Sequence, residues 1–105
     1  MTEKLSIVLS QMTQVVGDLA ANADAMRAVR ARHADVDLIV FPELQLIGYP
    51  PEDLVLKPAL AERAAGLLAG LAAETTSGPA MLVGSVERDE DGRLYNMVAL
   101  LDEGR

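Results

Sequence analysis

The fold is decided by residues 37–44, which read DLIVFPEL: an unbroken apolar run that stops at a proline and a carboxylate. A continuous apolar run of this length is typical of a strand with both faces covered. Pro42 cannot donate a hydrogen bond to a neighbouring strand, so the strand is expected to end there and to hold Glu43 in a stiff turn. A carboxylate at the C-terminal end of a buried strand, before a loop rich in Gly and Pro, is where α/β enzymes place chemistry.

The segments on either side of this strand predict an α/β fold with the element order β-α-β-α-β-β. Each predicted helix carries an apolar stripe at helical spacing. Asp18 is expected to cap the first helix, and Pro58 suits the first position of the second. The turn DEDG at residues 89–92 joins the last two strands into a hairpin. The predicted strands are residues 5–10, 37–41, 81–86 and 94–101, and the predicted helices are residues 19–34 and a segment from residue 58 to about residue 74.

Composition excludes several classes of function. The chain has 105 residues, which is at most one domain, and a net charge of −7. No basic patch exists to neutralise the phosphates of a nucleic acid or an anionic membrane surface, so neither is expected as a partner. No apolar stretch approaches the ~20 residues of a membrane-spanning helix. Absence of cysteine excludes disulfides, and the N-terminus lacks a secretory pattern, so a cytoplasmic location is expected.

The residues alone leave two interpretations of Glu43 and give little support to other sites. Glu43 is either an ordinary solvated carboxylate or a general base that its apolar flanks desolvate. Tyr49 is a loop aromatic that could pack on the neighbouring prolines. Asn96, in a strand, is expected to make a buried side-chain hydrogen bond. His33 has no partner ligands, so no metal site is predicted, and no phosphate-binding glycine loop is present.

A series of short motifs extends along the chain in a fixed order. It comprises Gln11, VGD at residues 16–18, Asn22, FPEL at 41–44, GYPPEDL at 48–54, VGS at 83–85 and YN at 95–96. This series resembles the carbon–nitrogen hydrolase (nitrilase) superfamily over nearly the whole chain. The segment at 48–54 is especially similar to the N-terminal glutaminase domain of the glutamine-dependent NAD⁺ synthetases.

The resemblance implies a fold and a reaction. The family fold is an α-β-β-α sandwich with a catalytic set of Glu, Lys and Cys. Glu43 matches the family's general base, which takes the proton of the cysteine before the thiolate attacks a carboxamide. Tyr49 matches a position at the substrate pocket for glutamine, near the route by which ammonia leaves. In the synthetases the ammonia passes to a separate domain that uses ATP and Mg²⁺ to amidate deamido-NAD⁺.

The sequence also departs from the family pattern. It has no cysteine, and neither of its lysines, Lys4 and Lys57, lies in a matching motif. Residues 1–105 are therefore expected to be the N-terminal portion of an incomplete glutaminase domain, without glutaminase activity by themselves. No cofactor or metal is expected within them, and uncovered apolar surface predicts a homo-oligomer. Two alternatives remain: part of a stand-alone amidase or carbamoylase, or a non-catalytic α/β interaction module.

Overall fold

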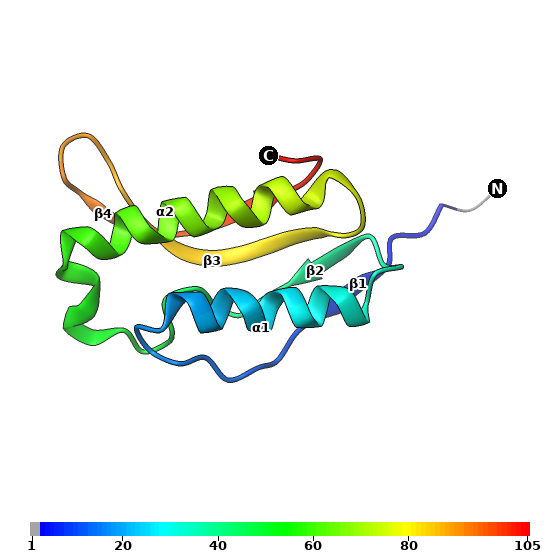
Figure 1. The fold of residues 1–105 in the computed structure, drawn as a ribbon, viewed down its shortest axis with the longest axis horizontal. Coiled ribbons are helices and arrows are strands. Elements are labelled where there is room, and N and C mark those ends of the chain that lie inside the picture. Colours follow the sequence, from blue (N-terminus) through cyan, green and yellow to red (C-terminus); the bar gives the residue numbers. More distant parts are fainter. Residues whose placement is uncertain (1–2) are drawn as a thin grey trace.

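The computed structural model describes residues 3–105, which form one four-stranded sheet and two α-helices (Figure 1). The predicted order β-α-β-α-β-β is confirmed, with two short 3₁₀ helices added, η1 and η2. The elements are β1 (Ile7–Leu9), α1 (Leu19–Arg32), β2 (Leu38–Val40), η1 (Glu52–Leu56), α2 (Pro58–Ala73), η2 (Glu74–Thr76), β3 (Ala80–Arg88) and β4 (Leu94–Leu101).

The four strands lie in the order β1-β2-β3-β4. The first three are parallel, because α1 and α2 carry the chain back between them, and β4 pairs with β3 in the predicted antiparallel hairpin. Strands β1 and β2 are shorter than predicted, whereas β3 extends to Arg88 because the hairpin partner pairs along its whole length. In this register Leu9, Val40, Leu82 and Leu100 form one row across the sheet.

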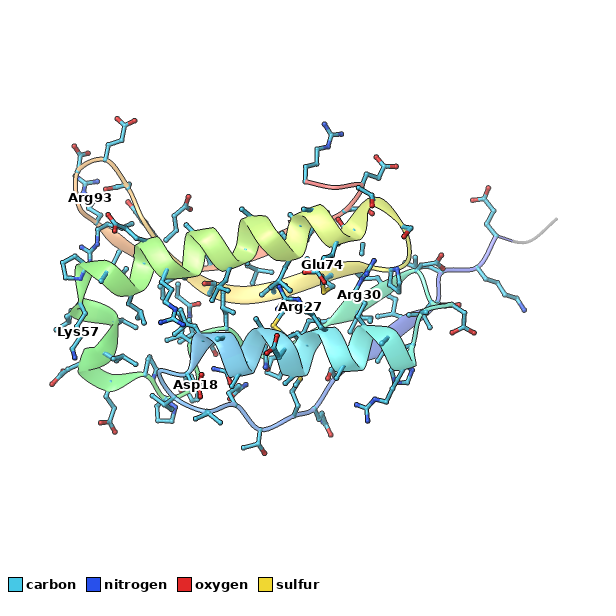
Figure 2. The ribbon with its side chains drawn as sticks, in the orientation of Figure 1. Asp18, Arg27, Arg30, Lys57, Glu74 and Arg93 are labelled. Atoms are coloured by element: carbon cyan, nitrogen blue, oxygen red, sulfur yellow. The ribbon has the colours of Figure 1, made fainter. Side chains whose placement is uncertain are left out.

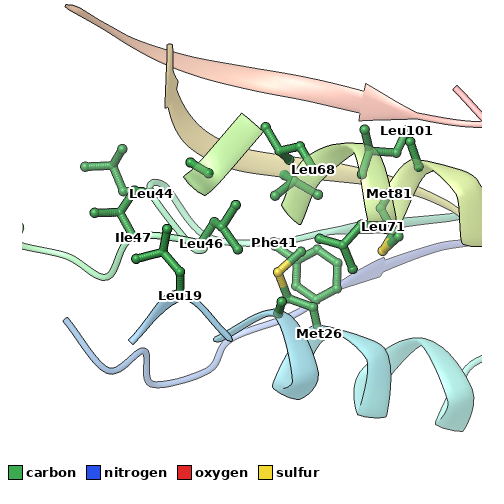
Figure 3. Packing of buried hydrophobic residues seen from close by; sticks show 14 of the residues in the cluster. Leu19, Met26, Phe41, Leu44, Leu46, Ile47, Leu68, Leu71, Met81 and Leu101 are labelled. Atoms are coloured by element: carbon green, nitrogen blue, oxygen red, sulfur yellow. The ribbon is translucent and has the colours of Figure 1, made fainter. Parts of the chain in front are cut away.

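Both helices lie on the same face of the sheet (Figure 1). Asp18 caps α1 as predicted: its Oδ1 accepts a hydrogen bond of 3.1 Å from the backbone N–H of Ala21. Pro58 is the first residue of α2. Figure 3 shows the core between helices and sheet, with the ring of Phe41 beside Met26 and the side chain of Leu71. The residues of the two predicted apolar stripes are all buried, except Leu67, which is partly buried. They are Leu19, Ala23, Met26 and Val29 on α1 and Leu60, Ala64, Leu67, Leu68 and Leu71 on α2.

The opposite face of the sheet has no helix against it among residues 3–105. For β2, the prediction that both faces of the strand are covered is therefore wrong within residues 3–105. Ile39 is fully buried, but Leu38 and Val40 on either side of it are only half-buried. Side chains alternate between the faces of a strand, and the helices cover one face only. We call the uncovered side the open face; its apolar residues are Ile7, Leu9, Leu38, Val40, Leu82, Val98 and Leu100.

Two arginines of α1 link this helix to the end of α2 and to the segment that follows it (Figure 2). Arg27 forms an ion pair with Glu74, at 2.8 Å, at the end of α2. The hydrogen bond to Glu74 raises the pKa of Arg27 above its ordinary value. Arg30 donates to the backbone carbonyls of Ser77 and Pro79, in the segment that leads into β3. Within residues 3–105, neither helix has the length and apolar character needed to cross a membrane.

Candidate functional site

Glu43 lies in a compact turn directly after β2. The backbone N–H of Phe41 still bonds to the carbonyl of Leu82 on β3, at 3.1 Å, and Pro42 then ends the pairing. The turn is closed by its own backbone hydrogen bonds: Gln45 N–H donates to the carbonyl of Pro42 at 3.2 Å, and Gly48 N–H to that of Leu44 at 2.8 Å. The stiff turn predicted from the proline is confirmed in this geometry.

The turn is pressed against β3 at Gly84. A Cβ atom on Gly84 would lie 2.4 Å from the backbone nitrogen of Leu44 and 2.9 Å from the carbonyl oxygen of Pro42. The backbone N–H of Leu46 also donates to the carbonyl of Gly84, at 3.1 Å. Only glycine permits this approach, so Gly84 sets the distance between the turn and the sheet.

The carboxylate of Glu43 is held by a side chain from β4. The Nδ2 atom of Asn96 donates a hydrogen bond of 2.7 Å to Oε1 of Glu43, across 53 residues of sequence. Both side chains are exposed. The desolvation expected for Glu43 and the burial expected for Asn96 are therefore wrong for the described residues, because the open face is not covered there. Sequence analysis missed the pairing, since no local pattern links the two positions.

Glu43 and Asn96 both line a depression of ≈ 400 Å³ on the open face. The rest of its lining is apolar or backbone, so a carboxylate and an amide are the polar side chains that meet there. The carboxylate can accept a proton while the amide holds it in place, which suits a general base. Attack on an amide carbon also needs a nucleophile, and the chain contains no cysteine. The lining residues are Phe41, Pro42, Glu43, Gly84, Asn96, Met97 and Val98.

Comparison with known proteins adds the family. The family model described as carbon-nitrogen hydrolase matches residues 7–105. The chain belongs to the carbon–nitrogen hydrolase family. It is 46% identical over 107 residues to the glutamine-dependent NAD(+) synthetase of Rhodobacter capsulatus, a match that covers 100% of this chain and 19% of that protein. It is 36% identical to the synthetase of the same description from Acinetobacter baylyi, covering 97% of this chain and 19% of the relative.

Solved carbon–nitrogen hydrolase structures show the same fold. The glutamine-dependent NAD⁺ synthetase of Acinetobacter baumannii, in complex with ADP, superposes with a TM-score of 0.85 at 37% identity, over 96% of this chain and 19% of that one. An amidase from Nesterenkonia sp. gives a TM-score of 0.79 at 24% identity, over 95% of this chain and 39% of the amidase. At that identity the amidase shows the fold alone. The chain thus spans about a fifth of the length of the synthetases it matches.

Tyr49, the second predicted site residue of this carbon–nitrogen hydrolase chain, does not line the depression that holds Glu43. Its side chain is 58% exposed, on the loop that follows the turn, and its peptide bond to Pro50 is cis. The loop packs closely against the segment before α1, since a Cβ on Gly48 would lie 2.5 Å from the Cα of Val16. Glu43 and Tyr49 are therefore held by the same rigid loop but are not brought together.

Asn22 on α1 anchors this loop to the helical layer and had no predicted role. It is buried, and its Nδ2 donates to the carbonyls of Leu46, at 3.1 Å, and Val15, at 2.8 Å. Its Oδ1 accepts from the backbone N–H of Val15 at 2.8 Å. One side chain thus joins the segment before α1 to the segment after Glu43. The available sequence signal was an asparagine directly before Ala23 of the apolar stripe, where a polar side chain needs hydrogen-bond partners if it is buried.

Proposed function

We propose that this chain is the first part of the glutamine-hydrolysing domain of a glutamine-dependent NAD⁺ synthetase and that Glu43 is its general base. The observation that carries the proposal is the placement of Glu43: at the carboxyl end of β2, exposed on the open face and oriented by Asn96. Similarity to the Rhodobacter capsulatus synthetase over the whole chain supports the choice of reaction.

In the proposed reaction, Glu43 accepts the proton of a cysteine thiol supplied from outside residues 1–105. The thiolate attacks the carboxamide carbon of glutamine, and the C–N bond breaks as ammonia leaves with a proton returned from the base. Water then hydrolyses the thioester to release glutamate. The role of this chain is to hold the carboxylate at a fixed position beside an apolar depression, which favours attack by keeping the base in a productive orientation.

Tyr49 is proposed to contact glutamine or the departing ammonia. Its phenol is exposed and carried on a rigid loop, so another segment could close over it. Replacing it as Tyr49→Phe removes the hydroxyl but keeps the ring. We expect the KM for glutamine or the fraction of ammonia passed to synthesis to change. Unchanged kinetics and unchanged transfer would leave Tyr49 as a packing residue of the loop.

ATP and Mg²⁺ are proposed to act in a separate domain of the synthetase. The residues present here do not fit them: no glycine-rich phosphate loop occurs in the sequence, and residues 3–105 contain no group of three or more His, Asp or Glu side chains that could hold a metal ion. No step of the glutamine reaction is therefore derived through either group. A cytoplasmic location and a homo-oligomer complete the proposal.

The proposal is tested by measuring ammonia release from glutamine. The 105-residue chain alone should show no turnover, whereas a protein translated from the reading frame continued past codon 105 should be active. In that protein Glu43→Gln should lower kcat by about 10²–10⁴-fold, because a general base is lost with little change of shape. Glu90→Gln, in the exposed hairpin turn, is the matched control and should leave kcat unchanged.

Three results would contradict the proposal. Robust turnover by the 105-residue chain would mean that the nucleophile is not a cysteine supplied from elsewhere. A continued reading frame that hydrolyses other amides and carries no ATP-using domain would instead make the protein a stand-alone amidase. A stop codon directly after codon 105 would favour the interaction module.

A further inference from the structure

We infer that Asn96 is a positioning residue for Glu43: it engages Oε1 and leaves Oε2 as the oxygen that accepts the proton. Asn96 acquires this role only if Glu43 is the general base proposed above. The inference assigns different tasks to the two oxygens of one carboxylate. It also gives a function to a residue of β4 that the sequence pattern left without one.

The direction of the hydrogen bond follows from chemistry. An ionised carboxylate only accepts hydrogen bonds, so the amide of Asn96 must present its Nδ2 to Glu43. The 2.7 Å separation is typical of a charge-assisted bond, which is stronger than a bond between neutral groups. Among residues 3–105 no other side chain or backbone group donates to Glu43, so Oε2 has no donor there, and Glu43 itself lines the depression.

Both ends of this bond are anchored to the same strand. The turn that carries Glu43 is fixed on β3 by the contact at Gly84 and by the bond from Leu46 to the Gly84 carbonyl. On the other side, Asn96 pairs with Val86 in the β3–β4 ladder, two residues along β3 from Gly84. The backbone positions of donor and acceptor are therefore set by one rigid element, and the hydrogen bond selects one orientation of an exposed, flexible side chain.

The neighbouring residue on β4 shows that the contact is specific to position 96. Tyr95 points to the other side of the strand, and its hydroxyl donates to Oδ2 of Asp89 at 3.1 Å. That bond stabilises the end of the hairpin and does not reach Glu43. Tyr95→Phe therefore removes one exposed side-chain hydrogen bond from β4 without touching the depression, which makes it a matched control.

The test compares steady-state kinetics of three variants in the glutamine-hydrolysing protein that contains this chain. Asn96→Ala should lower kcat by about 10–100-fold with KM for glutamine little changed, because the base loses its orientation rather than its substrate. Tyr95→Phe should match the wild type. Asn96→Asp keeps the shape of the side chain but replaces the donor with a second carboxylate.

The Asn96→Asp variant separates positioning from packing through its pH profile. At the acidic end the two carboxylates share one proton, which restores a donor to Oε1, so activity should approach that of the wild type. At the alkaline end both ionise and repel, so activity should fall toward that of Asn96→Ala. A role in packing alone predicts a wild-type profile for this isosteric variant, and that result would overturn the inference, as would an unchanged kcat in Asn96→Ala.

Crystal structures of the wild type and of Asn96→Ala keep this inference distinct from the proposed reaction. Asn96 is expected within hydrogen-bond distance of Glu43 in the wild type, and the Glu43 carboxylate is expected to take up more than one orientation in the variant. If the protein releases no ammonia from glutamine but the carboxylate loses its orientation, the proposed reaction fails and the positioning contact stands. One fixed orientation in both structures would overturn the positioning role.

Discussion

The two faces of the sheet are built from the same four strands and have opposite surroundings. On the helical face Ile39, Met81 and Val83 are at most 1% exposed. On the open face Leu9, at 74%, and Leu100, at 61%, are exposed to solvent. Both faces are apolar, so the difference lies in what packs against them and not in the strands themselves.

The two faces also divide stability from chemistry. The helical face holds the core and the buried anchor Asn22, whereas the open face holds Glu43, Asn96 and the depression between them. The turn that carries Glu43 contributes to both, because its leucines Leu44 and Leu46 lie in the core while its backbone packs against Gly84 of β3. Substitutions on one face should therefore affect the free energy of unfolding, and substitutions on the other should affect activity.

The largest expected effect comes from a matched pair of leucines. Leu71→Ala, on α2, should lower the free energy of unfolding by about 2–5 kcal/mol, since it leaves a cavity in a fully buried position. Leu100→Ala, on the open face, should change it by no more than about 0.5 kcal/mol. Urea unfolding of both variants measures the difference. Equal losses would break the comparison by showing that the open face is covered in solution, and light scattering would then test the predicted homo-oligomer.

A pair of glycines gives the next effect. Gly84→Ala should cost about 1–3 kcal/mol, because its Cβ would lie 2.4 Å from a backbone nitrogen of the Glu43 turn. Gly66→Ala, on the outer surface of α2, meets nothing within 4 Å and should stabilise the protein by about 0.5–1 kcal/mol. Thermal unfolding compares the two. A stable Gly84→Ala variant would mean that the turn can move away from β3.

Two asparagines sharpen the division between the faces. Asn22→Ala should lower the free energy of unfolding by about 1–3 kcal/mol, since the carbonyl of the buried Leu46 loses its side-chain donor and the partly buried backbone of Val15 loses two hydrogen bonds. Asn96→Ala, which removes an exposed side chain, should cost no more than about 0.5 kcal/mol while lowering activity. Denaturant unfolding checks both values. A larger loss of stability in Asn96→Ala than in Asn22→Ala would contradict the assignment of the two faces.

The smallest effect is expected on the outer surface of the helices. Arg27→Met should cost less than about 1 kcal/mol, because its ion pair with Glu74 is partly exposed. The pKa of Arg27 is raised in the folded state by its hydrogen bond to Glu74, so its contribution is present below the ordinary pKa of an arginine and is lost only above it. Because the ion pair is partly exposed, salt should weaken its contribution to stability at neutral pH. A change of pH around neutrality should not affect the charge of the Arg27 guanidinium. Arg32→Met is the control; an equal loss there would argue against a specific pair.

Local chemistry made much of the fold predictable. Asp18 caps α1 through a side-chain hydrogen bond. Pro58 begins α2 and Pro42 ends the pairing of β2 because proline has no backbone N–H to donate. The order of elements followed from these signals and from the periodicity of apolar residues between them. Uncovered apolar surface was expected from the sequence, but the strand residues that form the open face could not be predicted, because an apolar strand residue has the same local signature whether or not another layer covers it.

Of the two hydrogen-bonded residues of the candidate site, only Glu43 was predictable from the sequence. Glu43 was marked by the proline before it and by the family motif, and its place at the end of β2 is confirmed. Its partner Asn96 depends on strand register across a hairpin, and the need for glycine at position 84 depends on how closely the turn approaches β3. The catalytic role of Glu43 and the substrate contact of Tyr49 stay predictions.

The hydrogen bond between Glu43 and Asn96 has a consequence for the order of folding. Its partners are 53 residues apart, so the bond forms only after the hairpin has paired and docked beside the turn. During synthesis the turn after β2 leaves the ribosome well before β4 does. Glu43 is therefore present early but unoriented, and the chain acquires an aligned carboxylate only once the last strand of this sheet is in place.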